Sequence, residues 1–236
     1  MRLCDTQLPL QRVAREIGNK VFFMNQSPRL LVVLDVDSTL IEQEVIELLA
    51  DCAGKRQEVE AVTERAMSGE LDFAASLKAR VYYLKGLPES VIQETLAKCT
   101  PTKGAKELIA AVHAAGGKVG AVSGGFSQLL DPIAKSMNLD FSRANQLEVI
   151  DGILTGEVIG TIIDKPAKAT ALIEWAKASG IDIENTVAIG DGANDLDMMA
   201  VAGLSIGFNA KPRVRAAADL ILDSGDLSDA IALIGL

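Results

Sequence analysis

Short apolar runs alternate along the chain with longer segments in which apolar residues recur every three or four positions. Each run is short and rich in Val, Leu and Ile, which is typical of a strand buried on both faces. The predicted strands are 30–34, 118–123, 186–190, 204–208 and 219–223. The periodic segments predict helices within 101–117, 126–138 and 166–179, and one that begins near Asn194. Strands that alternate with helices predict an α/β fold with a doubly wound parallel sheet.

Two segments depart from this alternation. Residues 45–100 contain three segments with helical periodicity and no convincing strand, which predicts a helical cap inserted after the first core strand. The α/β core would then comprise 29–44 and 101–236. Residues 145–160 alternate polar and apolar positions around an Asp-Gly pair, the pattern of a β-hairpin. Residues 1–28 form an amphipathic, partly helical extension of unknown role.

Composition narrows the class of protein. The chain has 236 residues, 49% of them apolar, so a sizeable core is expected. Its formal charge is −9, so the chain lacks the excess of positive charge that is expected of a nucleic-acid binder. Three cysteines without metal-ligand spacing indicate free thiols in a reducing compartment. Because the chain shows neither a signal peptide nor a membrane-length apolar stretch, we expect a soluble cytoplasmic protein.

Carboxylates stand where two of the predicted strands end. Asp35 and Asp37 directly follow the first strand, and Asp191 follows the strand TVAIG, ahead of Asn194 and Asp195. A lone buried charge is costly, so these residues suggest a cation or a chemical task. Ligands of open parallel sheets bind outside the carboxyl ends of the strands. The two strand ends can therefore converge on one hard cation, and Mg²⁺ suits carboxylates better than Zn²⁺ does.

Simpler interpretations exist for each of these acidic segments. A calcium loop would need Gly and Glu at its sixth and twelfth positions, where the chain has Leu40 and Ile46. A polar strand end capped by two carboxylates remains open for the first pair. A helix cap remains open for Asn194 or Asp195 taken singly.

Two further segments indicate a phosphate site. Ser123 and Gly124 lie between a predicted strand and a helix, where backbone N–H groups can bind phosphate, although a tight turn also explains the glycines. Lys168 falls in the first turn of a helix that starts with proline, a place that the helix dipole disfavours for a cation. A bound anion would explain this lysine; solvent exposure is an alternative, and Lys165 is the competing candidate.

Together these segments resemble the motifs of the haloacid dehalogenase superfamily of phosphohydrolases. DVDST, SGG, the lysine in PAK and GDGAND follow that family's order and spacing across residues 30–225. The helical insertion resembles the cap of the phosphoserine phosphatases within the superfamily. The resemblance implies a Rossmann-like HAD core, a Mg²⁺ cofactor and hydrolysis of O-phospho-L-serine, the last step of L-serine biosynthesis.

The resemblance also implies roles for the acidic residues. Asp35 matches the nucleophile, which forms an aspartyl-phosphate, and Asp37 matches the general acid that protonates the departing oxygen. Asp35, the backbone carbonyl of Asp37 and Asp191 match the Mg²⁺ ligands. Asp195 would support the outer shell of the metal or orient Lys168.

The remaining matched residues would bind the substrate. Those that hold the phosphoryl group or lie beside it are Ser123, Gly124, Lys168 and Asn194. Glu44, nine residues after the nucleophile, matches the residue that meets the substrate ammonium, and Arg80, in the cap, matches the one that grips its carboxylate. Met67 and Phe73 match apolar residues that shield the pocket. Without the resemblance, core packing would be the better explanation for the apolar pair and a solvated surface pair for the charged one.

The predicted partner is therefore the small molecule O-phospho-L-serine, bound by a monomer or homodimer, with no nucleic acid and no membrane. The nearest alternative is the same chemistry, or phosphate transfer, on another small phosphoester such as phosphohomoserine. A receiver-like signalling module also groups acids, a hydroxyl and a lysine around Mg²⁺, but it lacks a second acid two residues after the nucleophile and a helical cap. A non-catalytic binder of divalent cations is a weaker alternative.

Overall fold

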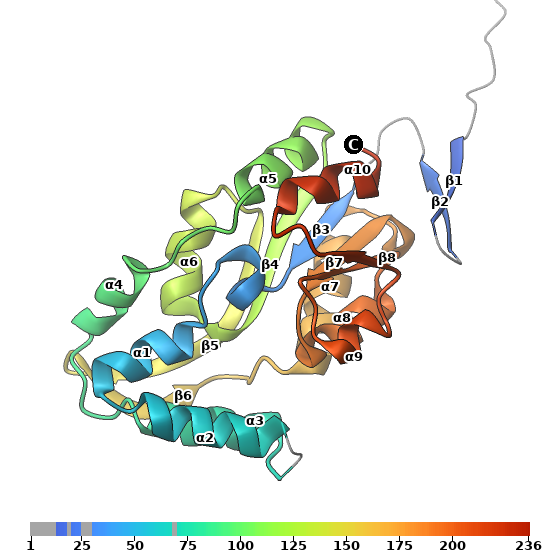
Figure 1. Cartoon of the computed structure of the whole chain (residues 1–236). Coiled ribbons are helices and arrows are strands. Elements are labelled where there is room, and N and C mark those ends of the chain that lie inside the picture. Colours follow the sequence, from blue (N-terminus) through green and yellow to red (C-terminus); the bar gives the residue numbers. More distant parts are fainter. Residues whose placement is uncertain (1–12, 18–19, 25–29, 68–69) are drawn as a thin grey trace, which may run out of the picture.

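A seven-stranded sheet organises the computed structural model, which describes residues 13–17, 20–24, 30–67 and 70–236 (Figure 1). The strands are β3 (Leu31–Leu34), β4 (Lys118–Phe126), β5 (Phe141–Ile150), β6 (Ile153–Ile159), β7 (Thr186–Gly190), β8 (Leu204–Phe208) and β9 (Leu220–Leu222). Their order is β6-β5-β4-β3-β7-β8-β9, and only β5 and β6 pair antiparallel. The predicted α/β fold with a mostly parallel sheet is confirmed.

Helices cover both faces of this sheet. They are α5 (Ala105–Ala114), α6 (Ser127–Ser136), α7 (Lys165–Ser179), α8 (Leu196–Val201), α9 (Pro212–Arg215) and α10 (Ala230–Ile234). Side chains alternate across β3, so Val32 and Leu34 join one apolar cluster with α5, α6 and α10. Leu31 and Val33 join a second cluster with α7, α8 and α9. All four side chains are fully buried, which accounts for the uninterrupted apolar run.

Helices also fill the segment between β3 and β4, as the periodicity predicts. They are α1 (Val45–Ala53), α2 (Arg56–Met67), α3 (Phe73–Tyr82) and α4 (Ser90–Leu96), the last of which the sequence did not reveal. The stretches through which the chain enters and leaves this segment pair with each other. Ile41 and Pro101 form a β-bridge, and the Thr102 N–H donates to the Leu40 carbonyl at 3.0 Å. On its far side the segment meets the sheet where α3 packs against β6.

Two local predictions have opposite outcomes. The Asp-Gly hairpin is confirmed: Asp151 and Gly152 connect β5 to β6 with φ values of 52° and 76°, as a type I′ turn requires. The helical character expected within 1–28 is wrong for the residues described there. These form an antiparallel pair of strands, β1 (Val13–Ile17) and β2 (Lys20–Met24). Residues 1–12, 18–19 and 25–29 lie outside the described part.

Two of the cysteines belong to the described residues. Cys52 and Cys99 are half-buried free thiols, as expected, whereas Cys4 falls outside the described ranges. Among the helices of those ranges, none combines the length and the hydropathy needed to cross a bilayer.

Close packing of an aromatic pair against β4 fixes how α7 lies on the sheet. The rings of Phe141 and Trp175 stack with centroids 5.3 Å apart and an angle of 10° between their planes. Gly120 lies beneath them, and a Cβ at this position would come within 2.7 Å of the indole ring. Because α7 carries Lys168, this contact also sets where that lysine lies relative to the strand ends.

Gly120→Ala is therefore expected to destabilise the protein by about 1–3 kcal/mol, the usual cost of overpacking a core. Urea unfolding followed by circular dichroism measures this change, and this signal does not depend on Trp175, the one tryptophan of the sequence. In a Trp175→Leu background the same substitution should cost clearly less, because the ring that it meets is gone. An equal loss in both backgrounds would show that the indole is not the constraint.

Candidate active site

The carboxyl ends of β3 and β7 bring two of the predicted acids together. These strands are parallel neighbours, and the Asp35 N–H continues their ladder by donating to the Ile189 carbonyl at 2.9 Å. Asp191 follows β7 directly. Both residues are buried, with 3% and 6% of their surface exposed. The sheet therefore places the two carboxylates at one edge, as the sequence predicted.

Asp195 is the third member of this acidic cluster. Carboxylate oxygens of Asp35, Asp191 and Asp195 lie within 4.8 Å of one another, and all three residues are buried. Asp195 stands at the end of a short 3₁₀ turn, Ala193–Asp195, where its carboxylate accepts the Gly192 N–H at 3.1 Å. Three acids at this distance inside a protein repel one another, so positive charge must lie among them.

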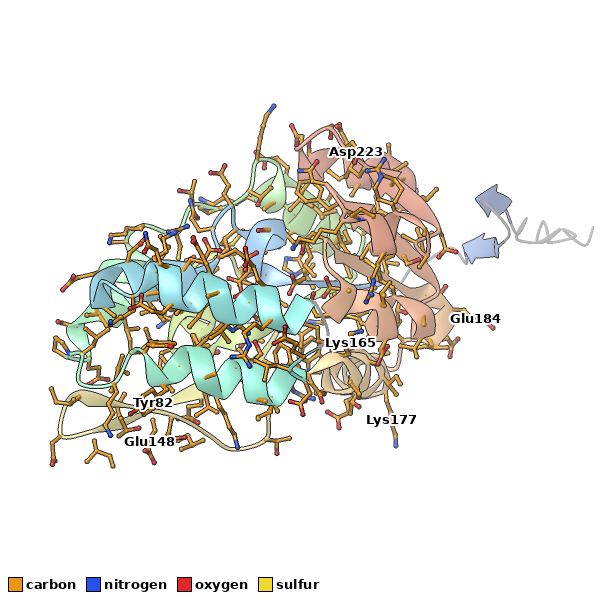
Figure 2. All side chains as sticks on the ribbon, turned by 60° about the horizontal axis from the view of Figure 1, so that its bottom comes forward. Tyr82, Glu148, Lys165, Lys177, Glu184 and Asp223 are labelled. Carbon is orange, nitrogen blue, oxygen red and sulfur yellow. The ribbon has the colours of Figure 1, made fainter. Side chains whose placement is uncertain are left out.

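Lys168 supplies part of that charge. Its Nζ donates to Asp35 at 2.5 Å and to Asp195 at 2.7 Å, and the residue is only 1% exposed. Burial lowers the pKa of Lys168, but the two carboxylates outweigh burial and hold the pKa above its ordinary value. The competing candidate, Lys165, is half-buried at the start of α7, and Lys177 marks the other end of this helix in Figure 2.

Lys211 supplies further charge, and the sequence analysis missed it. Its Nζ pairs with the Asp191 carboxylate at 2.8 Å, and its backbone N–H donates to the Asp191 carbonyl at 2.9 Å. Lys211 lies in the NAKP stretch that follows β8, the strand beside β7. The signal that could have identified Lys211 was its position as a basic residue just after β8. The sequence of a short loop, however, seldom shows where its side chains point.

Asp37 lies beside the cluster with a different environment. Its Oδ1 accepts the Val45 N–H at 3.0 Å and its Oδ2 accepts the Ser123 hydroxyl at 3.3 Å. Desolvation by the surrounding protein, together with the charge of Glu44, raises the pKa of Asp37 to about 7. A carboxyl group with this pKa can both donate and accept a proton near neutral pH.

Asp35 also has a raised pKa, because burial and repulsion from Asp195 outweigh the attraction of Lys168. An additional cation at the site would favour its ionised form. The donor set fits such an ion: three buried carboxylates are hard oxygen ligands, the type that Mg²⁺ and other hard divalent cations prefer. Asp35 and Asp191 would hold it, since both Asp195 oxygens already accept hydrogen bonds.

The predicted substrate-binding residues surround these acids. Ser123 is buried at the end of the apolar part of β4 and contacts Asp37. The Phe73 ring lies so close to Gly124 that a Cβ added to this glycine would be 3.0 Å from the ring. Asn194 is half-buried beside Gly192, next to the acidic cluster. These positions bring the SGG and GDGAND segments to one region of the molecule.

The charged cap residues also face this region. Glu44 accepts the hydroxyl of Ser38 at 2.8 Å, in a loop where Ser38 adopts a left-handed φ of 56°. Arg80 donates to the Ser76 carbonyl at 3.3 Å. Burial lowers the pKa of Arg80, while the nearby charges of Glu44 and Asp37 oppose that effect. Met67 ends α2, and its side chain lies outside the described part of the structure.

Comparison with known proteins identifies relatives over most of the chain. The sequence profile of the haloacid dehalogenase-like hydrolases matches residues 32–200. A phosphoserine phosphatase of Streptococcus thermophilus is 49% identical over 86% of this chain and 95% of its own length. The phosphoserine phosphatase SerB2 of Mycobacterium tuberculosis is 45% identical over 98% of this chain, which spans only 57% of that relative.

Solved structures show the same arrangement of the chain. A phosphoserine phosphatase carrying a phospho-aspartyl intermediate analogue superposes with a TM-score of 0.82 at 41% identity, covering 87% of this chain and 98% of the other. A substrate-bound phosphoserine phosphatase complex gives the same values. The relatives are thus similar in sequence and in fold over most of the chain.

The acidic cluster predicts that divalent cations stabilise the fold. At a Mg²⁺ concentration 100 times its dissociation constant, linkage adds about 2.7 kcal/mol, which raises the melting temperature by roughly 5–10 °C in a chain of this size. Scanning calorimetry with and without Mg²⁺ measures the shift. Asp191→Asn should abolish most of it, whereas Asp223→Asn, a surface acid paired with Arg215, should leave it unchanged. A full shift in Asp191→Asn would remove Asp191 from the ion site.

Proposed function

The chain belongs to the haloacid dehalogenase-like hydrolase family, and we propose that it hydrolyses O-phospho-L-serine to L-serine and phosphate. One observation carries the chemical part of the proposal. A buried aspartate, Asp35, is paired with a buried lysine and lies two residues from Asp37, whose pKa is about 7. These neighbouring carboxyl groups support the proposal that Asp35 acts as the nucleophile and Asp37 as the proton donor.

The first step would use Asp35 as the nucleophile. Lys168 holds its Oδ1 and so orients the carboxylate, which leaves the other oxygen to attack phosphorus. The P–O bond to serine breaks as the Asp35–phosphorus bond forms. A divalent cation held by Asp35, the Asp37 carbonyl and Asp191, which we propose is Mg²⁺, would offset the repulsion between the carboxylate and the phosphate. Lys168 and Ser123 would stabilise the phosphoryl oxygens.

Asp37 would move the protons of both steps. In its acid form it gives a proton to the departing serine oxygen, and it is then left as a carboxylate. In this form it takes a proton from the water that cleaves the aspartyl-phosphate, which regenerates Asp35 and releases phosphate. The raised pKa of Asp37 supports this exchange, because neither form is strongly disfavoured at neutral pH.

The helical segment 45–100 would act as a cap that selects the substrate. Glu44 offers a negative charge for an ammonium group, and Arg80 a forked donor for a carboxylate. The charge of Glu44 raises the pKa of Asp37, and the charges of Glu44 and Asp37 together act to raise the pKa of Arg80. Phe73, against Gly124, would exclude water from the phosphate, and we assign Met67 the same role. We further propose a cytoplasmic enzyme of serine biosynthesis, active as a monomer or homodimer.

A phosphate-release assay over small phosphoesters tests the proposal. With Mg²⁺ present, phosphoserine should give a higher kcat/KM than phosphothreonine or phosphohomoserine, and EDTA should stop turnover until Mg²⁺ is restored. Asp35→Asn should remove activity while the circular dichroism spectrum stays the same, and Asp223→Asn serves as the matched control. A higher kcat/KM for another ester would make that ester the substrate, and the proposed specificity would be wrong.

Arg80→Ala tests how the carboxylate is recognised. A hydrogen bond to a charged group contributes about 1.5–3 kcal/mol, so KM for phosphoserine should rise roughly 10- to 100-fold. Phosphoethanolamine, which has no carboxylate, should change by less than about threefold on the same reasoning. Lys78→Ala, an exposed cation on the same helix, is the control. Equal losses on both substrates would assign Arg80 a structural or catalytic role instead.

A further inference from the structure

A polar residue occupies an inward position of β5. Leu147, two residues further along this strand, is buried in the apolar cluster, and Asn145 is equally buried. Only 2% of its surface is exposed. An amide buried in this way costs free energy unless its donor and its acceptor are both satisfied. The position of Asn145 therefore calls for a specific set of partners.

Both ends of the Asn145 amide are satisfied by backbone groups. Its Nδ2 donates to the Gly124 carbonyl at 2.9 Å, and its Oδ1 accepts the Ile163 N–H at 2.8 Å. The two partners belong to different segments, one in β4 and the other in the connection from β6 to α7. The side chain is thus a bridge between parts of the chain that are far apart in sequence.

An interruption of the sheet creates the need for this bridge. The β4–β5 ladder shifts register between Val122 and Phe126, and Asn145 pairs through its backbone with Phe126. The intervening residues, which include Ser123 and Gly124, have no ladder partner on β5. The Asn145 side chain supplies the hydrogen bond that the Gly124 carbonyl would otherwise lack on this side.

The bridge reaches Ser123 through one rigid peptide unit. The Gly124 carbonyl and the Gly125 N–H belong to the same planar peptide, so holding one fixes the direction of the other. The Gly125 N–H donates to the Ser123 Oγ at 2.7 Å, and the Ser123 hydroxyl in turn contacts Asp37. Asn145 therefore orients the hydroxyl that faces the proposed proton donor.

The other end of the bridge leads to Lys168. Ile163 directly precedes Asp164, whose carboxylate caps α7 by accepting the Ala167 N–H at 3.0 Å. The Asp164 carbonyl accepts the Lys168 N–H, also at 3.0 Å. Fixing Ile163 thus fixes the start of the helix from which Lys168 extends to Asp35.

We propose that Asn145 is a positioning residue that holds the two phosphoryl-binding segments, SGG and the start of α7, in a fixed relation. The inference rests on the proposed function, because it assigns Ser123, Gly124 and Lys168 to the phosphoryl group. Asn145 does not touch the reacting atoms. It acts through backbone groups on both sides of the place where the phosphoryl group would bind.

Two variants and a matched control test this role. Asn145→Asp keeps the shape and the acceptor for Ile163 but sets an oxygen against the Gly124 carbonyl, and Asn145→Ala removes both bonds. The control is Thr186→Val, because Thr186 is also buried and also bonds two backbone groups, the Ile183 carbonyl and the Gly203 N–H. Thr186 stands at the start of β7, at the opposite end of the strand from Asp191.

The decisive quantity is the affinity for inorganic phosphate, measured as a competitive inhibition constant and by calorimetry. For variants that circular dichroism shows to be folded under the assay conditions, this constant reports binding and not the amount of active enzyme. Both Asn145 variants should bind phosphate at least ~10-fold more weakly, and kcat should fall by ~100-fold, as small misplacements of binding groups can cause. Thr186→Val should keep the wild-type phosphate affinity even where its melting temperature falls.

Two results would overturn the inference: unchanged phosphate affinity in Asn145→Asp, or an equal loss of affinity in Thr186→Val. The proposed function fails by a different result, which is a wild-type protein that releases no phosphate from phosphoserine. In that event calorimetry of phosphate binding to the same variants still decides the role of Asn145.

Discussion

The ion pairs of Lys168 are the interaction on which the site depends. Three buried carboxylates within 4.8 Å of one another could not stay charged in this place without positive charge between them. Lys168 reaches Asp35 and Asp195 from α7, while Lys211 reaches Asp191 from the loop after β8. A divalent cation would complete the balance of charge, since the three buried carboxylates are hard oxygen ligands that could hold one.

The fold makes this arrangement because adjacent parallel strands end at one edge of the sheet. β3, β4 and β7 are neighbours, and each delivers a polar group where its apolar run stops: Asp35, Ser123 and Asp191. The apolar residues behind them are fully buried, which holds the strand ends rigid. The helical segment 45–100 brings Phe73 and Arg80 toward the same edge, and Glu44 stands directly before its first helix. The sheet thus supplies the acidic groups and Ser123, and the helical segment with the residue before it supplies Glu44, Phe73 and Arg80.

The sequence was most informative where one local rule decides the structure. Strand ends, helical periodicity and the Asp-Gly turn follow from such rules, and Asp35, Ser123, Lys168 and Asp191 lie together as expected. Less could be predicted where contacts between distant segments determine the local structure. β4 continues through Gly125 to Phe126, although its glycines suggest a turn, because Asn145 replaces the missing ladder bond. The partner of Lys211 depends on loop geometry, and the strands β1 and β2 pair within a segment that was expected to be partly helical.

The central claim is that Asp35 forms a covalent bond to phosphorus during turnover. Mixing the enzyme with ³²P-labelled phosphoserine and Mg²⁺, quenching in acid within milliseconds and mapping the labelled peptide tests it most directly. The account predicts acid-stable, base-labile label on the peptide that contains Asp35, and none in Asp35→Asn. Label on Ser123, or turnover at full rate without any labelled protein, would contradict it.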